Sequence, residues 1–207
     1  MIKAILYDLD GVLVEAREWH YVSLNRALEE IAGTTINREE HEGDFNGLPT
    51  RRKLAKLVSL GRVKSEDRDR IWSKKQDLTK DTIRELGKYD KVKERLHHFT
   101  ANSGFVSVCV TNSITETAEL MLKYTGQLDY MKFFISNQMV THPKPSSEPY
   151  IVAMVRLGLE PSECIIVEDS EVGMQSAVPT GAPIWGVNNC ADVTEESFME
   201  FMKNRAK

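Results

Sequence analysis

The sequence has 207 residues, of which 41% are hydrophobic and 28% charged, a composition typical of a globular protein with one domain or one domain carrying an insert. Lys and Arg total 27 against 31 Asp and Glu, so the net charge of −4 gives no sign of a nucleic acid or a membrane surface as a partner. The three cysteines are widely spaced, the N-terminus is too short for a signal peptide, and no apolar stretch approaches the roughly 20 residues of a membrane span. We therefore expect a cytoplasmic protein with reduced thiols.

Five short apolar runs have the character of buried strands. Each run is nearly continuous rather than alternating, which is the pattern of a parallel sheet covered on both faces. The runs cover residues 2–7, 105–110, 133–136, 164–167 and 182–187. From about residue 90 onwards they alternate with helical patterns, so the chain is predicted to form a doubly wound, Rossmann-like α/β domain.

Helix signals separate these runs. Val92, Leu96 and Phe99 share one helical face before the second strand. Later helices are expected to start near Thr115, Ser146 or Ser147, Ser170 and Thr194. Pro179 predicts that the helix after Ser170 ends early, because proline cannot continue a helix.

Residues 15–88 break the alternation and contain no good strand. Apolar residues at helical spacing indicate three helices, the first ending at Gly33, the second ending at Gly61 and the third running over residues 65–86. We therefore expect an all-helical cap domain at residues 15–88, inserted into an α/β core domain formed by residues 1–14 and 89–207.

Polar residues whose side chains could take part in catalysis or binding follow four of the five predicted strands. In open α/β sheets, ligands bind at the carboxyl ends of the strands. The segments are Asp8-Leu9-Asp10-Gly11, Thr111-Asn112-Ser113, His142-Pro143-Lys144-Pro145 and Glu168-Asp169-Ser170. Each one alone is compatible with an ordinary turn or helix cap, but together they predict that acids, a hydroxyl and a cation converge on one site.

Phosphoryl transfer is the chemistry that needs such a set. A carboxylate can accept a phosphoryl group as an acyl phosphate, which divides one difficult displacement into two easier ones. Several carboxylates repel each other and the substrate, and Mg²⁺ with its oxygen ligands removes that repulsion. A lysine, a hydroxyl and backbone amides stabilise the charge on the transferred group, and a second aspartate can act as general acid and base.

The same segments resemble the four motifs of the haloacid dehalogenase-like superfamily, in order and over essentially the whole chain. The segment from Asp8 to Leu13 resembles the first motif, and Thr111-Asn112-Ser113 resembles the second. Lys144 with Tyr150 resembles the third. The segment Val167-Glu168-Asp169-Ser170, with Gly173 after it, resembles the fourth motif. The chain is most similar to the phosphatase and β-phosphoglucomutase branch, whose members carry a helical cap.

This resemblance implies a role for each motif residue. Asp8 would be the nucleophile and Asp10 the general acid and base. A magnesium ion would be held by Asp8, the main-chain carbonyl of Asp10 and Asp169, with Glu168 close by. The residues implied to bind the transferring phosphoryl group are Thr111, Asn112 and Lys144.

In this branch the cap closes over the site, excludes water and selects the substrate. His20 matches a histidine that faces the site in sugar-phosphate members, although an amphipathic helix could equally expose a histidine there. Residues 45–51 resemble the substrate-facing loop of the cap. Arg51 in that loop is a candidate to meet a distal anion, with Arg52 and Lys53 as alternatives and a solvated basic run as the simpler interpretation.

The sequence thus predicts a magnesium-dependent phosphatase that acts on a small phosphorylated metabolite, such as a sugar phosphate, through an aspartyl-phosphate intermediate. It is expected to be a monomer or a small homo-oligomer. A β-phosphoglucomutase-like phosphomutase is the main alternative, because it uses the same residues. Phosphonate hydrolysis would need a cap lysine poised for imine formation, and neither Lys53 nor Lys56 is singled out for that role. A signalling receiver domain would lack the helical insert, and the physiological substrate stays open.

Overall fold

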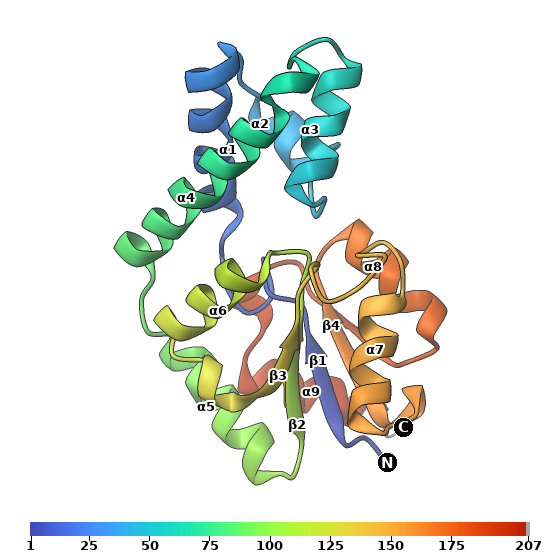
Figure 1. Ribbon diagram of the computed structural model, residues 1–207. Helices are drawn as coiled ribbons and strands as arrows, with labels where there is room; N and C mark the ends of the chain where they lie inside the picture. Colours follow the sequence, from blue (N-terminus) through green and yellow to red (C-terminus); the bar gives the residue numbers. More distant parts are fainter. Residues whose placement is uncertain (206–207) are drawn as a thin grey trace.

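The computed structural model describes residues 1–205, in which a five-stranded sheet is covered by helices and a second group of helices stands above one end of the sheet (Figure 1). Every neighbouring pair of strands is parallel. The strands are β1 (Ala4–Tyr7), β2 (Val106–Val110), β3 (Met131–Ile135), β4 (Cys164–Glu168) and β5 (Ile184–Gly186). The prediction of a doubly wound α/β sheet is confirmed.

The strand order is β3-β2-β1-β4-β5, so strands are added on one side of β1 first and on its other side afterwards. From β1 the chain builds one half of the sheet with β2 and β3 and then returns to add β4 and β5 on the other side. All residues of β1 and β4 are buried, because helices cover both faces of these central strands. Such a reversal opens a crevice at the carboxyl ends of the strands, where the predicted site residues lie.

Two layers of helices sandwich the sheet. Leu96, Met121 and Phe198 place α5, α6 and α9 against one face, whereas Tyr150 and Ala177 place α7 and α8 against the other. The α-helices of this part are α5 (Lys91–Asn102), α6 (Thr115–Tyr124), α7 (Glu148–Leu157), α8 (Glu171–Ala177) and α9 (Glu195–Arg205). Short 3₁₀ turns occur at η2 (Leu128–Tyr130), η3 (Pro161–Glu163), η4 (Val178–Thr180) and η5 (Cys190–Asp192).

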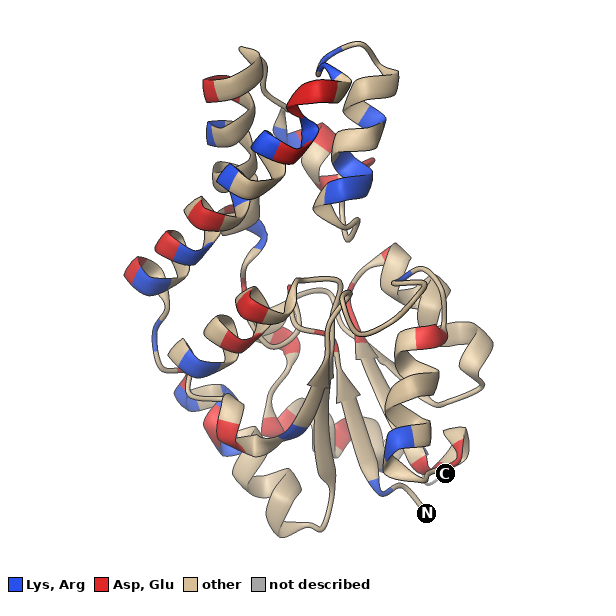
Figure 2. Ribbon diagram, in the orientation of Figure 1, with Lys and Arg blue, Asp and Glu red and all other residues tan. Residues whose placement is uncertain are grey.

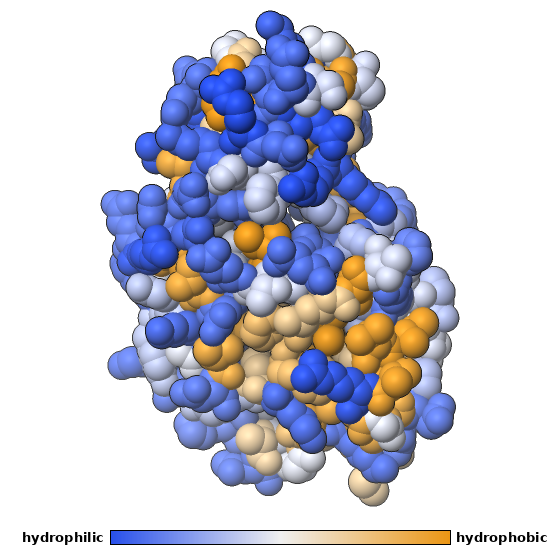
Figure 3. All heavy atoms as spheres, viewed as in Figure 1, coloured by the Kyte–Doolittle hydropathy of each residue, from blue (hydrophilic) through white to orange (hydrophobic). Residues whose placement is uncertain are grey.

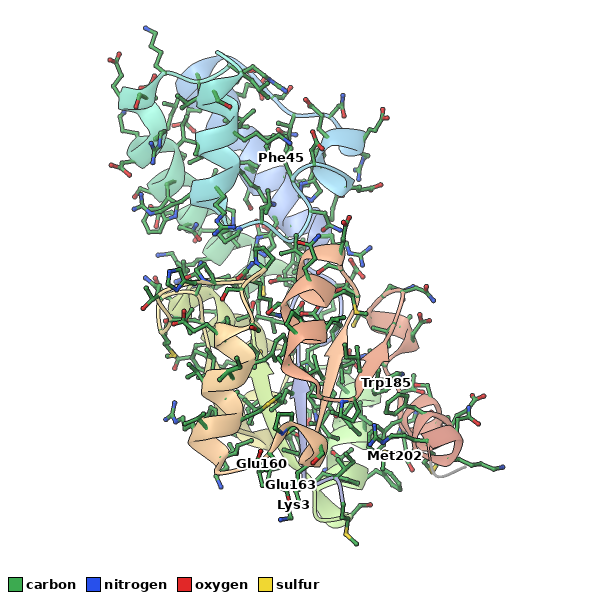
Figure 4. The ribbon with its side chains drawn as sticks, turned by 90° about the vertical axis from the view of Figure 1, so that its right-hand side faces the viewer. Lys3, Phe45, Glu160, Glu163, Trp185 and Met202 are labelled. Carbon is green, nitrogen blue, oxygen red and sulfur yellow. The ribbon has the colours of Figure 1, made fainter. Side chains whose placement is uncertain are left out.

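The helices between β1 and α5 form a separate apolar cluster. Leu24, Leu28, Leu57 and Ile71 are buried in it together with Phe45, which Figure 4 shows between the cap helices. The elements are α1 (Arg17–Ala32), α2 (Arg38–Glu42), α3 (Thr50–Ser59), η1 (Ser65–Asp67) and α4 (Arg68–Leu86). We call them the cap, and we keep residues 15–88 as its proposed extent.

Helix boundaries follow the local signals, with informative differences. Gly33 ends α1 in the left-handed conformation, as expected for a helix C-terminus. The short helix α2 was not predicted, and a capping box between Asn37 and Glu40 accounts for it. Helix α8 stops at Ala177 and continues only as a 3₁₀ turn through Pro179, as the proline predicts.

The surface of the core carries an ion pair at the end of the sheet away from the cap and several exposed apolar side chains. Figure 4 shows Lys3 and Glu163 at the end of the sheet away from the cap, where they form an ion pair at 2.7 Å. Figure 3 shows apolar side chains gathered on the core, and Ile151 and Val155 on the outer face of α7 are exposed. Within residues 1–205, no helix combines the length and apolar character needed to cross a membrane.

Candidate active site

The carboxyl ends of the strands bring the four motif segments together beneath the cap. Asp8 directly follows β1, Thr111 follows β2, and Glu168 is the last residue of β4. Lys144 comes from the loop between β3 and α7. Because these strands are parallel neighbours, residues far apart in the sequence face one another at this edge.

A buried lysine ties two of the carboxylates together. The Lys144 ammonium donates to Asp8 Oδ1 at 2.7 Å, to Glu168 Oε1 at 2.6 Å and to the Tyr150 hydroxyl at 2.9 Å. Tyr150 also donates to Glu168 Oε1 at 2.6 Å. Burial by itself would lower the pKa of Lys144, but the two carboxylates hold that pKa above its usual value. Lys144 is therefore a fixed positive charge beside Asp8.

Three carboxylates form a cluster that suits a metal ion. Oxygens of Asp8, Glu168 and Asp169 lie within 4.8 Å of one another. Burial and the neighbouring carboxylates raise the pKa of Asp8 well above its usual value, although Lys144 opposes them. Asp169 Oδ1 is buried and accepts no hydrogen bond from the described residues, while Oδ2 pairs with Arg17. An unsatisfied oxygen in a group of repelling carboxylates fits a hard divalent cation.

Two glycines allow this cluster to be so compact. Gly11 has φ of +92°, and a side chain there would overlap the Asp169 carboxylate. Gly173 lies in the first turn of α8, and a side chain there would overlap the Glu168 carboxylate. Both motif glycines are therefore needed for the close approach of backbone and carboxylates.

The second aspartate points towards the cap. Asp10 Oδ1 is 2.8 Å from His20 Nε2, and its Oδ2 accepts from the Ser113 hydroxyl at 3.0 Å. Burial alone would raise the pKa of Asp10, but His20, Ser113 and the nearby Lys75 lower it. Asp10 and Asp8 are thus held in opposite electrostatic environments.

The hydrogen bonds of His20 define its tautomer. Its Nδ1 lies 3.0 Å from the Lys75 ammonium, which has only hydrogens to offer. When Lys75 is protonated, Nδ1 is therefore the acceptor, and Nε2 carries the hydrogen that points to Asp10. Burial and the positive charge of Lys75 lower the pKa of His20, which is consistent with this neutral form.

A cavity of about 400 Å³ separates the core from the cap. It is lined from below by Asp8 and Asp10 and from above by α1, α3 and α4. Asn112 connects the two parts, because its side-chain amide donates to Gly47 O of the cap at 2.9 Å and to Lys144 O at 3.1 Å. The cap therefore rests closed on the core in this structure.

Eight of the nine candidate residues named from the sequence are linked to one another by hydrogen bonds or through the carboxylate cluster, and the ninth, Arg51, also lines the cavity. Thr111 contributes by accepting from the Ser113 amide at 2.9 Å, with its hydroxyl 3.5 Å from Asp10 Oδ2. Arg51 is the exception, since its guanidinium at the cavity rim is bonded to Asp69 at 2.8 Å and stacked over Trp72. The eight that come together are Asp8, Asp10, His20, Thr111, Asn112, Lys144, Glu168 and Asp169.

The structure also adds Arg17, Ser113 and Lys75, which the sequence analysis did not name as site residues, and it places Lys53, named there as an alternative to Arg51, at the cavity. Arg17 covers Asp169, and Ser113 fixes Asp10. Lys53 and Lys75 line the cavity from the cap. A signal for both lysines exists in the sequence, because Lys53 precedes Leu57 by one helical turn and Lys75 follows Ile71 by one turn, on the apolar faces of their helices.

Comparison with known proteins agrees with this geometry. The sequence profile of the haloacid dehalogenase-like hydrolases matches residues 5–187, so the chain belongs to this family. Pyrophosphatase PpaX of Bacillus velezensis is 28% identical over 187 residues, which cover 90% of this chain and 83% of that protein. A phosphoglycolate phosphatase of Thiobacillus denitrificans is 28% identical over 213 residues, covering 94% of this chain and 88% of that protein.

Solved structures show the same fold. The crystal structure of β-phosphoglucomutase from Clostridium difficile superposes with a TM-score of 0.84 over 100% of both chains, at 18% sequence identity. CbbY from Rhodobacter sphaeroides, solved with phosphate, superposes with a TM-score of 0.80 over 90% of this chain and 86% of that chain, at 21% identity.

Proposed function

We propose that this hydrolase is a magnesium-dependent phosphatase that releases phosphate from a small phosphorylated metabolite through an aspartyl-phosphate on Asp8. The observation that carries the proposal is the position of the Asp8 carboxylate, which is held by Lys144 in a cluster with Glu168 and Asp169 beneath the cavity between core and cap. The relatives PpaX and phosphoglycolate phosphatase support it, because they act on phosphorylated small molecules.

In the first step a carboxylate oxygen of Asp8 forms a bond to phosphorus while the bond from phosphorus to the ester oxygen breaks. Lys144 stays beside the transferring group and stabilises its negative charge. The leaving oxygen takes a proton from Asp10. Asp10 enters this step as the carboxylic acid and is left as a carboxylate, which accepts from His20 Nε2 at 2.8 Å and from the Ser113 hydroxyl at 3.0 Å.

In the second step water attacks phosphorus and the bond from phosphorus to Asp8 breaks, which releases inorganic phosphate and restores the carboxylate. Asp10 accepts the proton of the attacking water, as a general base. Its environment favours the charged form required for this step, because the pKa of Asp10 is lowered by His20 and Ser113 against the effect of burial.

Magnesium is the proposed metal because the cluster offers oxygen ligands only. Asp8, Asp169 and the main-chain carbonyl of Asp10 would hold it, with Glu168 beside them and bonded to Lys144. When bound, the ion supplies positive charge that offsets repulsion between the carboxylates and the phosphate.

The test is phosphate release from a panel of phosphorylated metabolites and from p-nitrophenyl phosphate, with magnesium and with chelator. We expect turnover with magnesium and none with chelator. Release that is unaffected by chelator would contradict the metal assignment, and no release from any compound would contradict the phosphatase.

A phosphomutase is the second candidate, favoured by one observation. Asn112 holds the cap closed over Asp8, and a closed site keeps water from an aspartyl-phosphate. Incubation with a hexose 1-phosphate separates the two functions, because a mutase yields the 6-phosphate isomer and a phosphatase yields free phosphate and hexose.

A further inference from the structure

The cap side of the cavity contains two buried lysines. Lys53 on α3 is 8% exposed and Lys75 on α4 is 5% exposed, and both line the cavity. Figure 2 shows basic positions in the first turn of α3, above the carboxyl ends of the strands. Burial lowers the pKa of Lys53 to about 8, and burial together with Lys53 lowers the pKa of Lys75 to about 7. Lysines are rarely buried unless an anion compensates them.

Neither ammonium group has such an anion in the protein. No hydrogen bond or ion pair to the Lys53 ammonium is found among residues 1–205, and within the same residues Lys75 contacts only His20 Nδ1. Three basic neighbours on the same helices are paired instead, whereas Arg52, which is exposed and also lines the cavity, has no ion pair among residues 1–205. These pairs are Arg51 with Asp69, Lys56 with Asp44 and Lys74 with Glu30.

The carboxylates around the cavity are already engaged. Asp10 is the acidic group whose charge acts on both lysines, and its two oxygens are occupied by His20 and Ser113. Asp8 is bonded to Lys144 at the opposite side of the cavity. The cap side therefore has uncompensated positive charge, and the core side has the acidic cluster.

We propose that Lys53 and Lys75 bind a second anionic group of the substrate, so that the substrate is a phosphomonoester that also carries a carboxylate or a second phosphate. This proposal rests on the proposed function, because it assumes that the first phosphate lies at Asp8. A neutral analogue would leave two buried ammonium groups unpaired, and a site of this kind rejects such analogues strongly. The cavity of about 400 Å³ suits a small metabolite.

The first experiment compares matched esters. Phosphoglycolate is paired with ethyl phosphate, and 1,3-propanediol bisphosphate is paired with 3-hydroxypropyl phosphate. We expect kcat/KM to be at least about tenfold higher for the charged member of at least one pair, and the pair that responds identifies carboxylate or phosphate. In Lys53→Met this preference should fall to about one, whereas the control Lys74→Met, on the exposed side of α4, should keep it.

The second experiment measures binding without turnover. Calorimetry with 3-phosphonopropionate and propylphosphonate should show tighter binding of the first compound to the wild type and equal binding of both to Lys53→Met. If the wild type treats charged and neutral compounds alike, or Lys53→Met keeps the preference, the proposal is wrong while the phosphatase assignment stands. Failure to release phosphate from any ester rejects the phosphatase, and calorimetry then still decides the anion site.

A third measurement separates charge recognition from imine chemistry. Borohydride treatment in the presence of phosphonoacetaldehyde, followed by mass spectrometry, should leave Lys53 unmodified. A reduced adduct on Lys53 would assign this lysine to covalent chemistry and overturn its role in binding an anion.

Discussion

Asp8 and Asp10 are separated by a single residue, yet their surroundings shift the pKa values of the two carboxyl groups in opposite directions. Burial and three neighbouring carboxylates raise the pKa of Asp8, against the effect of Lys144. Despite burial, hydrogen bonds from the cap histidine and from Ser113 lower the pKa of Asp10. The chain turns at Gly11, directly after Asp10, and here the Asp8 side chain faces the metal cluster while that of Asp10 faces the cap.

Replacing the nucleophile gives the sharpest test at the residue scale. We expect Asp8→Asn to lose at least about 10³-fold in turnover, because the amide cannot form the acyl phosphate. The amide oxygen can still accept from Lys144, so the fold should be retained. Phosphate release and circular dichroism check the two parts, and appreciable residual turnover would rule out Asp8 as the nucleophile.

Lys53 yields a prediction about stability and pH. Its pKa is lowered from 10.5 to about 8 in the folded protein, so its burial opposes folding while the side chain is charged. Between these pH values the unfolded chain binds more protons, and the wild type regains the lost stability as pH rises. Lys53→Met should therefore be more stable than the wild type by on the order of 2 kcal/mol at pH 7.

The same comparison at higher pH provides the control. The advantage of Lys53→Met should shrink above pH 8 and disappear near pH 10.5, as measured by urea denaturation at each pH. A difference that does not depend on pH would show that packing, rather than the buried charge, accounts for the change.

At the scale of elements, the start of α8 is fitted to the end of β4. Ser170 caps the helix by accepting from the Gly173 amide at 3.1 Å. Gly173 in turn lies against the Glu168 carboxylate, which holds Lys144. The helix start therefore supports the charge network beside Asp8.

A methyl group at Gly173 should disturb this fit. We expect Gly173→Ala to lose about 1–3 kcal/mol of stability, because Glu168 is buried and cannot move away freely. Turnover should fall as well, since Glu168 positions Lys144. Gly186→Ala is the matched control, because a side chain there meets no atom within 4 Å. Equal effects of the two substitutions on Tm would contradict the fit.

At the scale of the whole molecule, the cap and the core each have their own apolar cluster and meet around the cavity. The acidic side belongs to the core and the basic side to the cap. A molecule divided in this way can recognise both ends of a substrate when it closes, and Asn112 supplies one contact of the closed state.

Magnesium should stabilise the whole fold. A cation that binds only the folded state adds RT ln(1 + [L]/Kd), which is about 2.7 kcal/mol at a hundredfold excess over Kd. We expect Tm to rise with added magnesium, to return with chelator, and to respond much less in Asp169→Asn. An unchanged Tm in the wild type across millimolar magnesium would argue against the metal site.

Much of the fold could be predicted because the signals are local. Near-continuous apolar runs indicate buried parallel strands, and the polar segments after them indicate the site edge; β1, β2 and β4 follow these runs closely. Helix α2 was missed because a capping box, rather than an apolar repeat, produces it. Strand β5 is shorter than its apolar run at both ends, since its pairing with β4 covers only Ile184 to Gly186.

What the sequence by itself determined is the α/β class and the set of motif residues, because strand periodicity and motif order are properties of neighbouring positions. Which cap residues face the site was decided only by the tertiary structure. Both Arg51 and Lys53 line the cavity, but Arg51 pairs with Asp69, whereas Lys53, two residues later, is buried there. The physical reason is that successive side chains of a helix are rotated by about 100°. The way α3 packs on its neighbours therefore determines that Lys53 is the residue whose side chain is buried.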